Sequence, residues 1–300
     1  MAHPVARRPL VVILEVLFLI VFWAWLLAAL LFLRNTLLPR LPILQTPEQF
    51  GLPADPVEFE ASDGLRLQGW KITGDPDRPW IILCHGLGTN RADLLDIAAG
   101  LHAAGFSLLL FDFRGHGNSA GRMTSFGWTE QQDLEGALAL LSRQAEIPTT
   151  PYGVYGISMG GSVALMVAAR DERIGAVAVD SPYTSLQETL DRHLTLLYPW
   201  APRVPFHWFV LATYRMRYGV WPASVSPQAS AARLAPRPLL LINGAEDPRM
   251  PVEGARRIYA AAGEPKELWL IGGAGHLEGY AVNPAMYLDR LVRFFRASLR

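Results

Sequence analysis

A run of 24 residues near the N-terminus, Leu10–Leu33, constrains the chain most strongly, because 23 of these residues are apolar and the only charge is Glu15. As an α-helix the run would be roughly 36 Å long, enough to cross a hydrocarbon core of about 30 Å with some tilt. Its 18 Leu, Ile, Val and Phe residues outweigh the cost of one carboxylate near the end of the helix. The sequence therefore predicts a membrane anchor over residues 1–38, with a span of about 10–33.

A cleaved signal peptide is the alternative interpretation of this run. Such peptides have an apolar region of about 7–15 residues that ends in an A-x-A-like site. Here the run is longer, and Arg34-Asn35-Thr36 follows it without such a site. We therefore expect an uncleaved, single-pass signal anchor. Arg7, Arg8 and the amino terminus precede the span, whereas Arg34 and Arg40 follow it. The positive-inside rule then narrowly favours a cytoplasmic N-terminus and an extracytoplasmic domain.

The composition excludes several classes of protein. Lys plus Arg and Asp plus Glu both total 27, so the chain has no excess of cations to neutralise nucleic-acid phosphates. A single cysteine, Cys84, excludes an internal disulfide framework and a Cys-based zinc site, and we expect it to be a small buried strand residue. Five prolines within residues 39–56 predict an extended linker over residues 39–55: Pro39, Pro42, Pro47, Pro53 and Pro56.

From Pro56 to the C-terminus, short apolar runs alternate with helical patterns. Val57–Glu60 and Leu65–Ile72 flank an Asp-Gly turn and predict a β-hairpin. The remaining strands are expected at Trp80–Cys84, Phe106–Phe111, Tyr152–Gly156, Gly175–Val179, Pro238–Ile242 and Glu267–Ile271. Helices are expected at Ala92–Ala104, Glu130–Ser142, Ser162–Arg170, Val252–Ala262 and Pro284–Ser298. This order predicts an α/β domain over residues 56–300, with a mostly parallel sheet covered by helices on both faces.

An insertion at about residues 186–235 interrupts the alternation and predicts a cap over the carboxyl ends of the strands. Residues 194–222 contain eight aromatic residues, and four prolines are expected to cut the insertion into short pieces. The aromatic side chains fit an apolar pocket for an acyl chain, the cap's own core, or contact with the membrane surface. The sequence leaves these three interpretations open.

The strongest motif is Gly156-Ile157-Ser158-Met159-Gly160, which lies between an expected strand and an expected helix. This is the context that the G-x-S-x-G motif requires. A serine on a sharp strand-to-helix turn projects its hydroxyl, and Gly156 and Gly160 lack side chains that would block the turn. The helix that follows directs free N–H groups and the positive end of its dipole toward an oxyanion. Ser158 is therefore the candidate nucleophile.

With these motifs in this order, the region from Pro56 to Arg300 resembles the α/β-hydrolase superfamily. Five more segments match the loops of this superfamily: 85–88 (HGLG), 112–119 (DFRGHGNS), 180–183 (DSPY), 244–251 (GAEDPRMP) and 273–276 (GAGH). The likeness is closest to membrane-anchored bacterial hydrolases of the serine aminopeptidase-like and lysophospholipase-like branch. The resemblance implies the α/β-hydrolase fold with a helical cap insertion. It also implies that His85 and Gly86 belong to a structural loop.

The resemblance implies a triad of Ser158 as nucleophile, His276 as base and Asp247 as the acid that orients His276. It also implies an oxyanion hole formed by the backbone N–H groups of Leu87 and Met159. Two other carboxylates compete with Asp247: the adjacent Glu246, and Asp180 at the end of a predicted strand.

The function expected from these residues is a membrane-anchored serine hydrolase that cleaves carboxylic esters of small molecules or lipid-like substrates through an acyl-enzyme. An amidase or aminopeptidase with the same triad is the nearest alternative, and a non-catalytic binding or scaffold protein on the same fold is the other. The motifs of metal, nucleotide and dinucleotide chemistry are missing from the sequence. We therefore expect no metal and no cofactor. The sequence determines neither the acyl length nor the oligomeric state.

Overall fold

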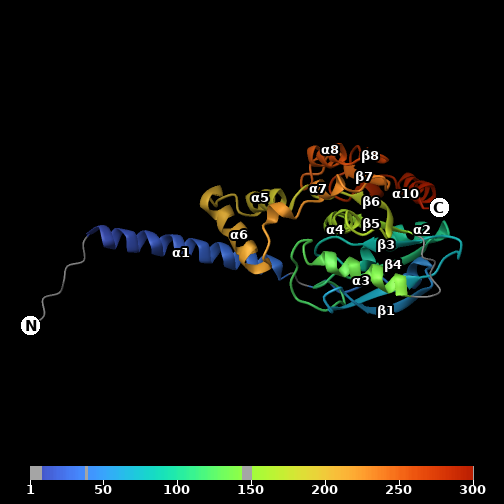
Figure 1. The fold of residues 1–300 in the computed structure, drawn as a ribbon, viewed down its shortest axis with the longest axis horizontal. Coiled ribbons are helices and arrows are strands. Elements are labelled where there is room, and N and C mark those ends of the chain that lie inside the picture. The colour runs from blue at the N-terminus through green and yellow to red at the C-terminus, as the bar shows by residue number, and fades with distance from the viewer. Residues whose placement is uncertain (1–8, 38–39, 144–150, 300) are drawn as a thin grey trace, which may run out of the picture.

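The computed structural model describes residues 9–37, 40–143 and 151–299. Its centre is an eight-stranded sheet in the order β1-β2-β4-β3-β5-β6-β7-β8 (Figure 1). The strands are β1 (Ala54–Glu60), β2 (Arg66–Ile72), β3 (Trp80–Cys84), β4 (Ser107–Phe111), β5 (Tyr152–Ile157), β6 (Ile174–Asp180), β7 (Leu239–Gly244) and β8 (Lys266–Ile271). The first two strands form the predicted antiparallel hairpin, and β2 also pairs antiparallel with β4. All later pairings are parallel.

Helices cover both faces of the sheet, which confirms the predicted fold class. The central strands are buried on both sides, so neighbouring side chains of β3 enter different cores. Ile82 and Cys84 pack in one core and Ile81 and Leu83 in the other. The first core also takes side chains from α3 (Glu130–Arg143), α4 (Met159–Ala168), α7 (Pro227–Ala231) and α8 (Val252–Ala261). The second core takes them from α2 (Leu95–Ala103) and α10 (Pro284–Ser298).

Two helices begin at other residues than the pattern predicts. The helix expected from Ser162 begins at Met159, directly after Ser158. Gly160 and Gly161 lie in its first turn, and their low helix propensity hides that turn from a pattern-based prediction. The helix expected over 92–104 divides into a short 3₁₀ turn, η2 (Arg91–Leu94), and α2. Asn90 caps this turn, because its side-chain oxygen accepts a hydrogen bond from the N–H of Ala92.

The insertion forms two long helices, α5 (Leu186–Leu197) and α6 (Arg203–Tyr218), followed by a 3₁₀ turn, η3 (Pro222–Ser224), and the short helix α7. The expectation that its prolines cut it into short pieces is therefore wrong. Val204 has extended dihedral angles (φ −110°, ψ 126°), so the regular part of α6 begins at Pro205. A proline in the first helical turn loses no intrahelical hydrogen bond and is tolerated there. Pro199 and Pro202 lie in the connection before α6.

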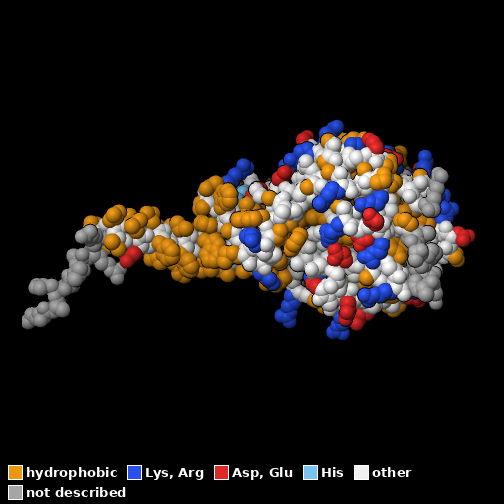
Figure 2. All heavy atoms as spheres, viewed as in Figure 1, with side chains coloured by type: hydrophobic (Ala, Val, Ile, Leu, Met, Phe, Trp, Pro, Cys, Tyr) orange, Lys and Arg blue, Asp and Glu red, His pale blue; other side chains and the backbone are white. Residues whose placement is uncertain are grey.

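The N-terminal run lies within a single helix of 28 residues, α1 (Pro9–Thr36), which is long and apolar enough to cross a membrane. It is the only such helix in the described part of the chain. Residues 9–24 are exposed, and Figures 1 and 2 show this apolar half projecting away from the rest of the molecule. The C-terminal half packs against α6 of the cap. A third apolar core lies there and contains Ala28 and Phe32 together with Leu190, Phe206 and Tyr214.

The segment after α1 lies against the domain. It includes a short 3₁₀ turn, η1 (Pro47–Phe50), and leads into β1. Leu52 is buried in the second core, and Ile43 and Phe50 pack against that core. Arg40 Nη1 donates a hydrogen bond to the carbonyl of Gly117 at 3.4 Å. The described part of the connection between α1 and the sheet, residues 40–53, is therefore held to the domain at several points.

Candidate active site

Ser158 occupies a sharp turn between β5 and α4. Its backbone has φ 49° and ψ −116°, a conformation that L-residues rarely adopt. The turn is held on both sides, because the N–H of Ser158 donates to the carbonyl of Asp180 at 2.8 Å and its carbonyl accepts from the N–H of Ser162 at 3.0 Å. The strained backbone is thus fixed by β6 and α4, and the hydroxyl is directed into a cavity.

The glycines on either side of Ser158 are required by close backbone contacts. A Cβ atom on Gly160 would lie 2.3 Å from the carbonyl oxygen of Cys84 and 2.4 Å from that of His85. A Cβ atom on Gly156 would lie 2.6 Å from the carbonyl oxygen of Gly160. Real Cβ contacts are never this short, so α4 can approach the end of β3 only with glycine at 160 and the end of β5 only with glycine at 156. The structure therefore explains both glycines of the motif.

Three residues from distant parts of the chain meet at this turn. His276, in the loop after β8, has its Nε2 atom 3.1 Å from Ser158 Oγ. Its Nδ1 atom lies 2.7 Å from Asp247 Oδ2, in the loop after β7. With Nδ1 donating to the carboxylate, Nε2 is left as the acceptor for the serine hydroxyl. The structure thus brings together all three residues that the sequence analysis assigned to a triad, at hydrogen-bond distance.

The carboxylate of Asp247 is held as an anion. Its side chain is fully buried, and burial raises the pKa of the carboxyl. Hydrogen bonds to the carboxylate oppose this effect of burial. His276 donates one of them, and the N–H groups of Arg249 and Met250 each donate to Oδ1 at 2.8 Å. The pKa of Asp247 is therefore lowered, because these donors favour the ionised form. An ionised carboxylate at Nδ1 stabilises a positive charge on His276.

The other two carboxylates have different positions. Glu246 is exposed. Asp180 is buried, and its oxygens accept hydrogen bonds from Ser181 Oγ at 2.9 Å and from Tyr287 Oη at 2.7 Å. Burial raises the pKa of Asp180 by more than these two hydrogen bonds lower it. Asp180 thus supports the turn through its backbone carbonyl, whereas Asp247 contacts His276.

The loop after β3 forms the opposite wall of the site. His85 is buried: its Nδ1 donates to the carbonyl of Gly86 at 2.7 Å and its Nε2 accepts from the N–H of Phe113 at 3.0 Å. Burial, with help from His116, lowers the pKa of His85, so the ring is neutral. His116 accepts from the N–H of Gly88 at 3.1 Å. These two rings hold the loop so that Gly86 and Leu87 line the same cavity as Ser158 and Met159.

This cavity has a volume of about 300 Å³ and extends from Ser158 and His276 to the cap. That volume is at the lower end of the range for small-molecule sites. Most of its wall is apolar and comes from α5, α6 and the loop that contains Phe126. His193 of α5 also lines it, with Nδ1 at 2.8 Å from the carbonyl of Thr189. Arg249 is an exposed cation at its edge.

One wall of the cavity was not expected from the sequence. Leu31, Phe32 and Asn35 of α1 line it, although the sequence analysis assigned this part of the chain to the membrane anchor. Apolar side chains that face lipid and apolar side chains that face protein have the same composition, so hydropathy does not separate them. The one available signal is Asn35, a polar residue directly after the apolar run.

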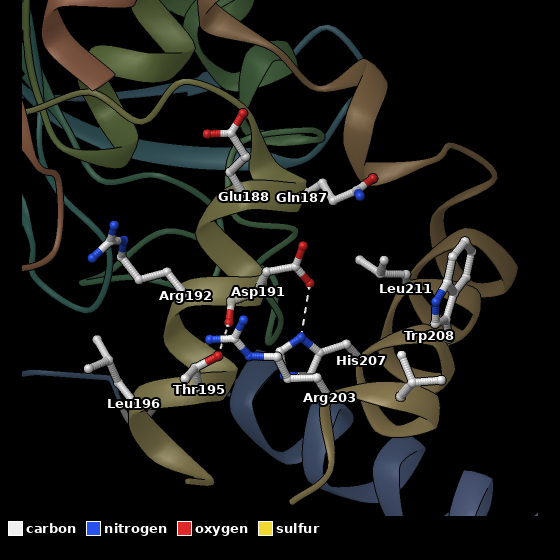
Figure 3. Close-up of a pocket in the computed structure, with 11 residues that line it drawn as sticks. Gln187, Glu188, Asp191, Arg192, Thr195, Leu196, Arg203, His207, Trp208 and Leu211 are labelled. Carbon is white, nitrogen blue, oxygen red and sulfur yellow. Dashed lines mark hydrogen bonds and ion pairs between the residues drawn. The ribbon is translucent and has the colours of Figure 1, made fainter. Parts of the chain in front are cut away.

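A second, more open hollow of about 550 Å³ lies between α5 and α6. Figure 3 shows His207 of α6 directed at Asp191 of α5, with 3.2 Å between Nδ1 and Oδ1. This contact joins the two cap helices. None of the three residues of the candidate triad lines this hollow. No group of three or more His, Cys, Asp or Glu side chains in the described ranges is placed to hold a metal ion.

The sheet order, the strained turn at Ser158 and the helical cap define an α/β hydrolase. The family described as serine aminopeptidase, S33, matches residues 75–226, and the chain belongs to this family. Two uncharacterized proteins are among its relatives. Rv2307c of Mycobacterium tuberculosis is 31% identical over 79% of this chain and 78% of its own length. YfhR of Escherichia coli K12 is 29% identical over 82% of both chains.

Solved structures have the same fold as this chain. The esterase Pf2001 of Pyrococcus furiosus superposes with a TM-score of 0.73 at 27% sequence identity, over 88% of this chain and 98% of that one. The hypothetical protein PA2218 of Pseudomonas aeruginosa has a TM-score of 0.63 at 21% identity, over 87% and 100%. The similarity to PA2218 shows a shared fold and no more.

Proposed function

We propose that this chain is a membrane-anchored serine hydrolase that cleaves carboxylic esters. The observation that carries the proposal is the chain of short contacts from Ser158 Oγ to His276 at 3.1 Å and on to Asp247 at 2.7 Å. This arrangement opens into a cavity and lies on the turn that best exposes a nucleophile. The Pyrococcus furiosus neighbour, described as an esterase, supports the same reaction.

In this mechanism, Ser158 Oγ attacks the ester carbonyl carbon while His276 Nε2 takes the hydroxyl proton. Asp247 stabilises the imidazolium that forms. The backbone N–H groups of Leu87 and of Met159, at the start of α4, donate hydrogen bonds to the negative oxygen of the tetrahedral intermediate. When the intermediate collapses, the C–O bond breaks and the alcohol leaves with the proton from His276. Water then attacks the acyl-Ser158 ester by the same steps and releases the carboxylic acid.

The description of the family as serine aminopeptidases favours a second candidate, the hydrolysis of N-terminal peptide bonds. An aminopeptidase must bind the positive α-amino group of its substrate, and carboxylates do this best. Among the described residues, those that line the cavity include no aspartate or glutamate, and Arg249 at its edge would repel a cation. Electrostatics therefore favours a neutral ester over a peptide with a free amino group.

The anchoring proposal rests on α1. Residues 9–24 form an exposed apolar helix, and exposure of so much apolar surface to water is unfavourable. We infer that this half of α1 lies in the membrane. Since Arg7 and Arg8 precede the helix, the narrow charge bias places the N-terminus in the cytoplasm and the catalytic domain on the opposite side.

The test of the reaction is covalent labelling of the full-length protein in detergent with a fluorophosphonate, which reacts with activated serines. Wild type should be labelled, and Ser158→Ala should lose both the label and ester turnover, by a factor on the order of 10⁶ in kcat. Ser62→Ala is the matched control, because Ser62 is exposed on the β1–β2 turn. It should be labelled like wild type. Folded wild type that stays unlabelled would refute the proposal.

The choice between the two reactions needs matched substrates. A p-nitrophenyl ester and a p-nitroanilide of the same acyl group differ only in the bond that is cleaved. We expect kcat/KM for the ester to be at least 100-fold higher. Faster cleavage of an aminoacyl anilide than of the ester would instead assign the chain to the aminopeptidases.

A further inference from the structure

The helix α1 changes its surroundings along its length. Residues 9–24 are exposed, whereas Ala28 and Phe32 are buried against the cap. The Phe32 ring lies 6.0 Å from that of Tyr214 in α6. At the end of α1, Asn35 Nδ2 donates to Tyr198 Oη at 3.0 Å. The last three turns of α1 are therefore an integral part of the folded domain and are fixed relative to Ser158.

The same turns border the candidate active site. Leu31, Phe32 and Asn35 line the cavity that holds Ser158 and His276. The side chains opposite them are apolar and come from the cap, with Leu194 and Phe206 among them. A narrow space with apolar walls and one polar end is complementary to a fatty acyl chain whose ester carbonyl lies at Ser158.

The position of the bilayer follows from the length of the exposed half of α1. Sixteen residues, 9–24, rise roughly 24 Å, which is shorter than a hydrocarbon core of about 30 Å. The core must therefore extend about four residues further, to the level at which α1 meets the cap. Two exposed tryptophans lie on this part of the cap: Trp200 between α5 and α6, at 67%, and Trp208 in α6, at 61%. Figure 2 shows apolar side chains on α1 and on the adjacent cap. Tryptophans are typical of the membrane interface.

We propose that α1 forms one wall of an acyl-chain-binding pocket that opens at the bilayer surface, and that the substrate is a long-chain acyl ester taken laterally from the membrane leaflet. This inference rests on the proposed ester hydrolysis. The acyl chain moves from the leaflet to the space between α1 and the cap, whose walls are mostly apolar. Ser158 then attacks its carbonyl carbon, the alcohol leaves with the proton held by His276, and water later releases the fatty acid.

The experiment compares two substitutions on adjacent residues of α1 in full-length protein in phosphatidylcholine nanodiscs. Leu31→Trp places an indole in the pocket, whereas Leu30, 57% exposed, faces away from it. For each variant, kcat/KM is measured for a hexadecanoyl and a butanoyl ester of the same alcohol. Leu31→Trp should lower the ratio of long to short ester at least ten-fold, and Leu30→Trp should leave the ratio at the wild-type value. An unchanged ratio in Leu31→Trp overturns the proposal.

A second measurement separates this proposal from the proposed reaction. Ser158→Ala in the same nanodiscs is irradiated with a hexadecanoyl glycerol ester that carries a diazirine near the end of its chain. We expect cross-links at Leu31 and at Leu194 or Phe206, which excess unlabelled ester removes. Cross-links confined to residues 10–23 overturn the pocket. If wild type cleaves neither ester, the hydrolase proposal fails, and the cross-links alone decide whether the pocket binds acyl chains.

Discussion

At the scale of single residues, the carboxylate of Asp247 is the clearest example of a side chain prepared by its surroundings. Its two oxygens accept hydrogen bonds from His276 and from two backbone N–H groups of its own loop. The two backbone donors are the N–H groups of Arg249 and Met250, which follow Asp247 closely in the chain and turn back toward its carboxylate. The loop therefore fixes the acid before the histidine of a different loop contacts it.

The lowered pKa of Asp247 predicts a pH dependence of stability. Since the pKa is lower in the folded than in the unfolded protein, the folded state binds fewer protons in this window and stability rises with pH. The contribution of Asp247 is present above the unfolded pKa of 3.8 and is lost as the pH falls through the folded value. The difference in melting temperature between wild type and Asp247→Asn should therefore shrink from pH 5 to pH 3.

The control for this prediction is Glu246→Gln, which removes the exposed neighbouring carboxyl. Its difference from wild type should stay constant over the same pH range. A difference between wild type and Asp247→Asn that is equally constant would contradict the assignment of the lowered pKa to this residue.

The positions of Ser158, Asp247 and His276 could be predicted because each lies in a loop whose glycines and prolines leave a recognisable pattern. Gly160 shows why: a backbone contact of 2.3 Å at its Cβ position excludes any other residue. Leu31 and Phe32 could not be predicted as pocket residues. The identity of an apolar side chain does not show whether it contacts lipid or another side chain.

At the scale of elements, the contact between α1 and the cap joins two segments that are far apart in the chain. Phe32 is 4% exposed, and its ring packs between Phe126 at 6.2 Å and Tyr214 at 6.0 Å. The N–H of Thr124 donates to the carbonyl of Thr36 at 3.0 Å. The cap therefore depends on α1 for part of its core.

Phe32→Ala should destabilise the cap more than the sheet. Removing a buried phenylalanine side chain costs about 3–5 kcal/mol, and the loss falls on the interface of α1 with α6. Hydrogen exchange should become faster in residues 205–218 and stay at the wild-type rate in β5 and β6. Phe18→Ala is the matched control on the same helix, because Phe18 is 67% exposed. Equal exchange rates in α6 for both variants would show that α1 does not support the cap.

The positions of the strands along the chain were more predictable than the cap, for a physical reason. Strands buried on both faces leave continuous apolar runs, and β3 has the predicted bounds. The sequence pattern does not predict the long helix of the cap, because proline commonly interrupts a helix, whereas Pro205 lies where the regular part of α6 begins. A proline excludes a helical residue before it far more strongly than helical residues after it.

At the scale of the whole molecule, the proposed orientation across the membrane rests on a few charges at the two ends of α1. Alkaline phosphatase, which is active only outside the cytoplasm, should be active when fused after Arg300. Because the charge bias is narrow, Arg7→Glu with Arg8→Glu should transfer a large share of the molecules to the opposite orientation. A cytoplasmic reporter that is active on the wild-type fusion would contradict the predicted sidedness.

The docking of α1 onto the cap also determines how the rate of such an enzyme must be described. A domain on a flexible tether samples many heights and tilts above a surface. Here the contacts of Asn35 and Thr36 with the domain fix the position and the tilt of Ser158 relative to α1. Under the proposed function, encounters with a leaflet substrate take place by two-dimensional diffusion. The rate should follow the mole fraction of the ester within the membrane, and dilution of the sample at a constant lipid composition should leave the turnover per molecule unchanged.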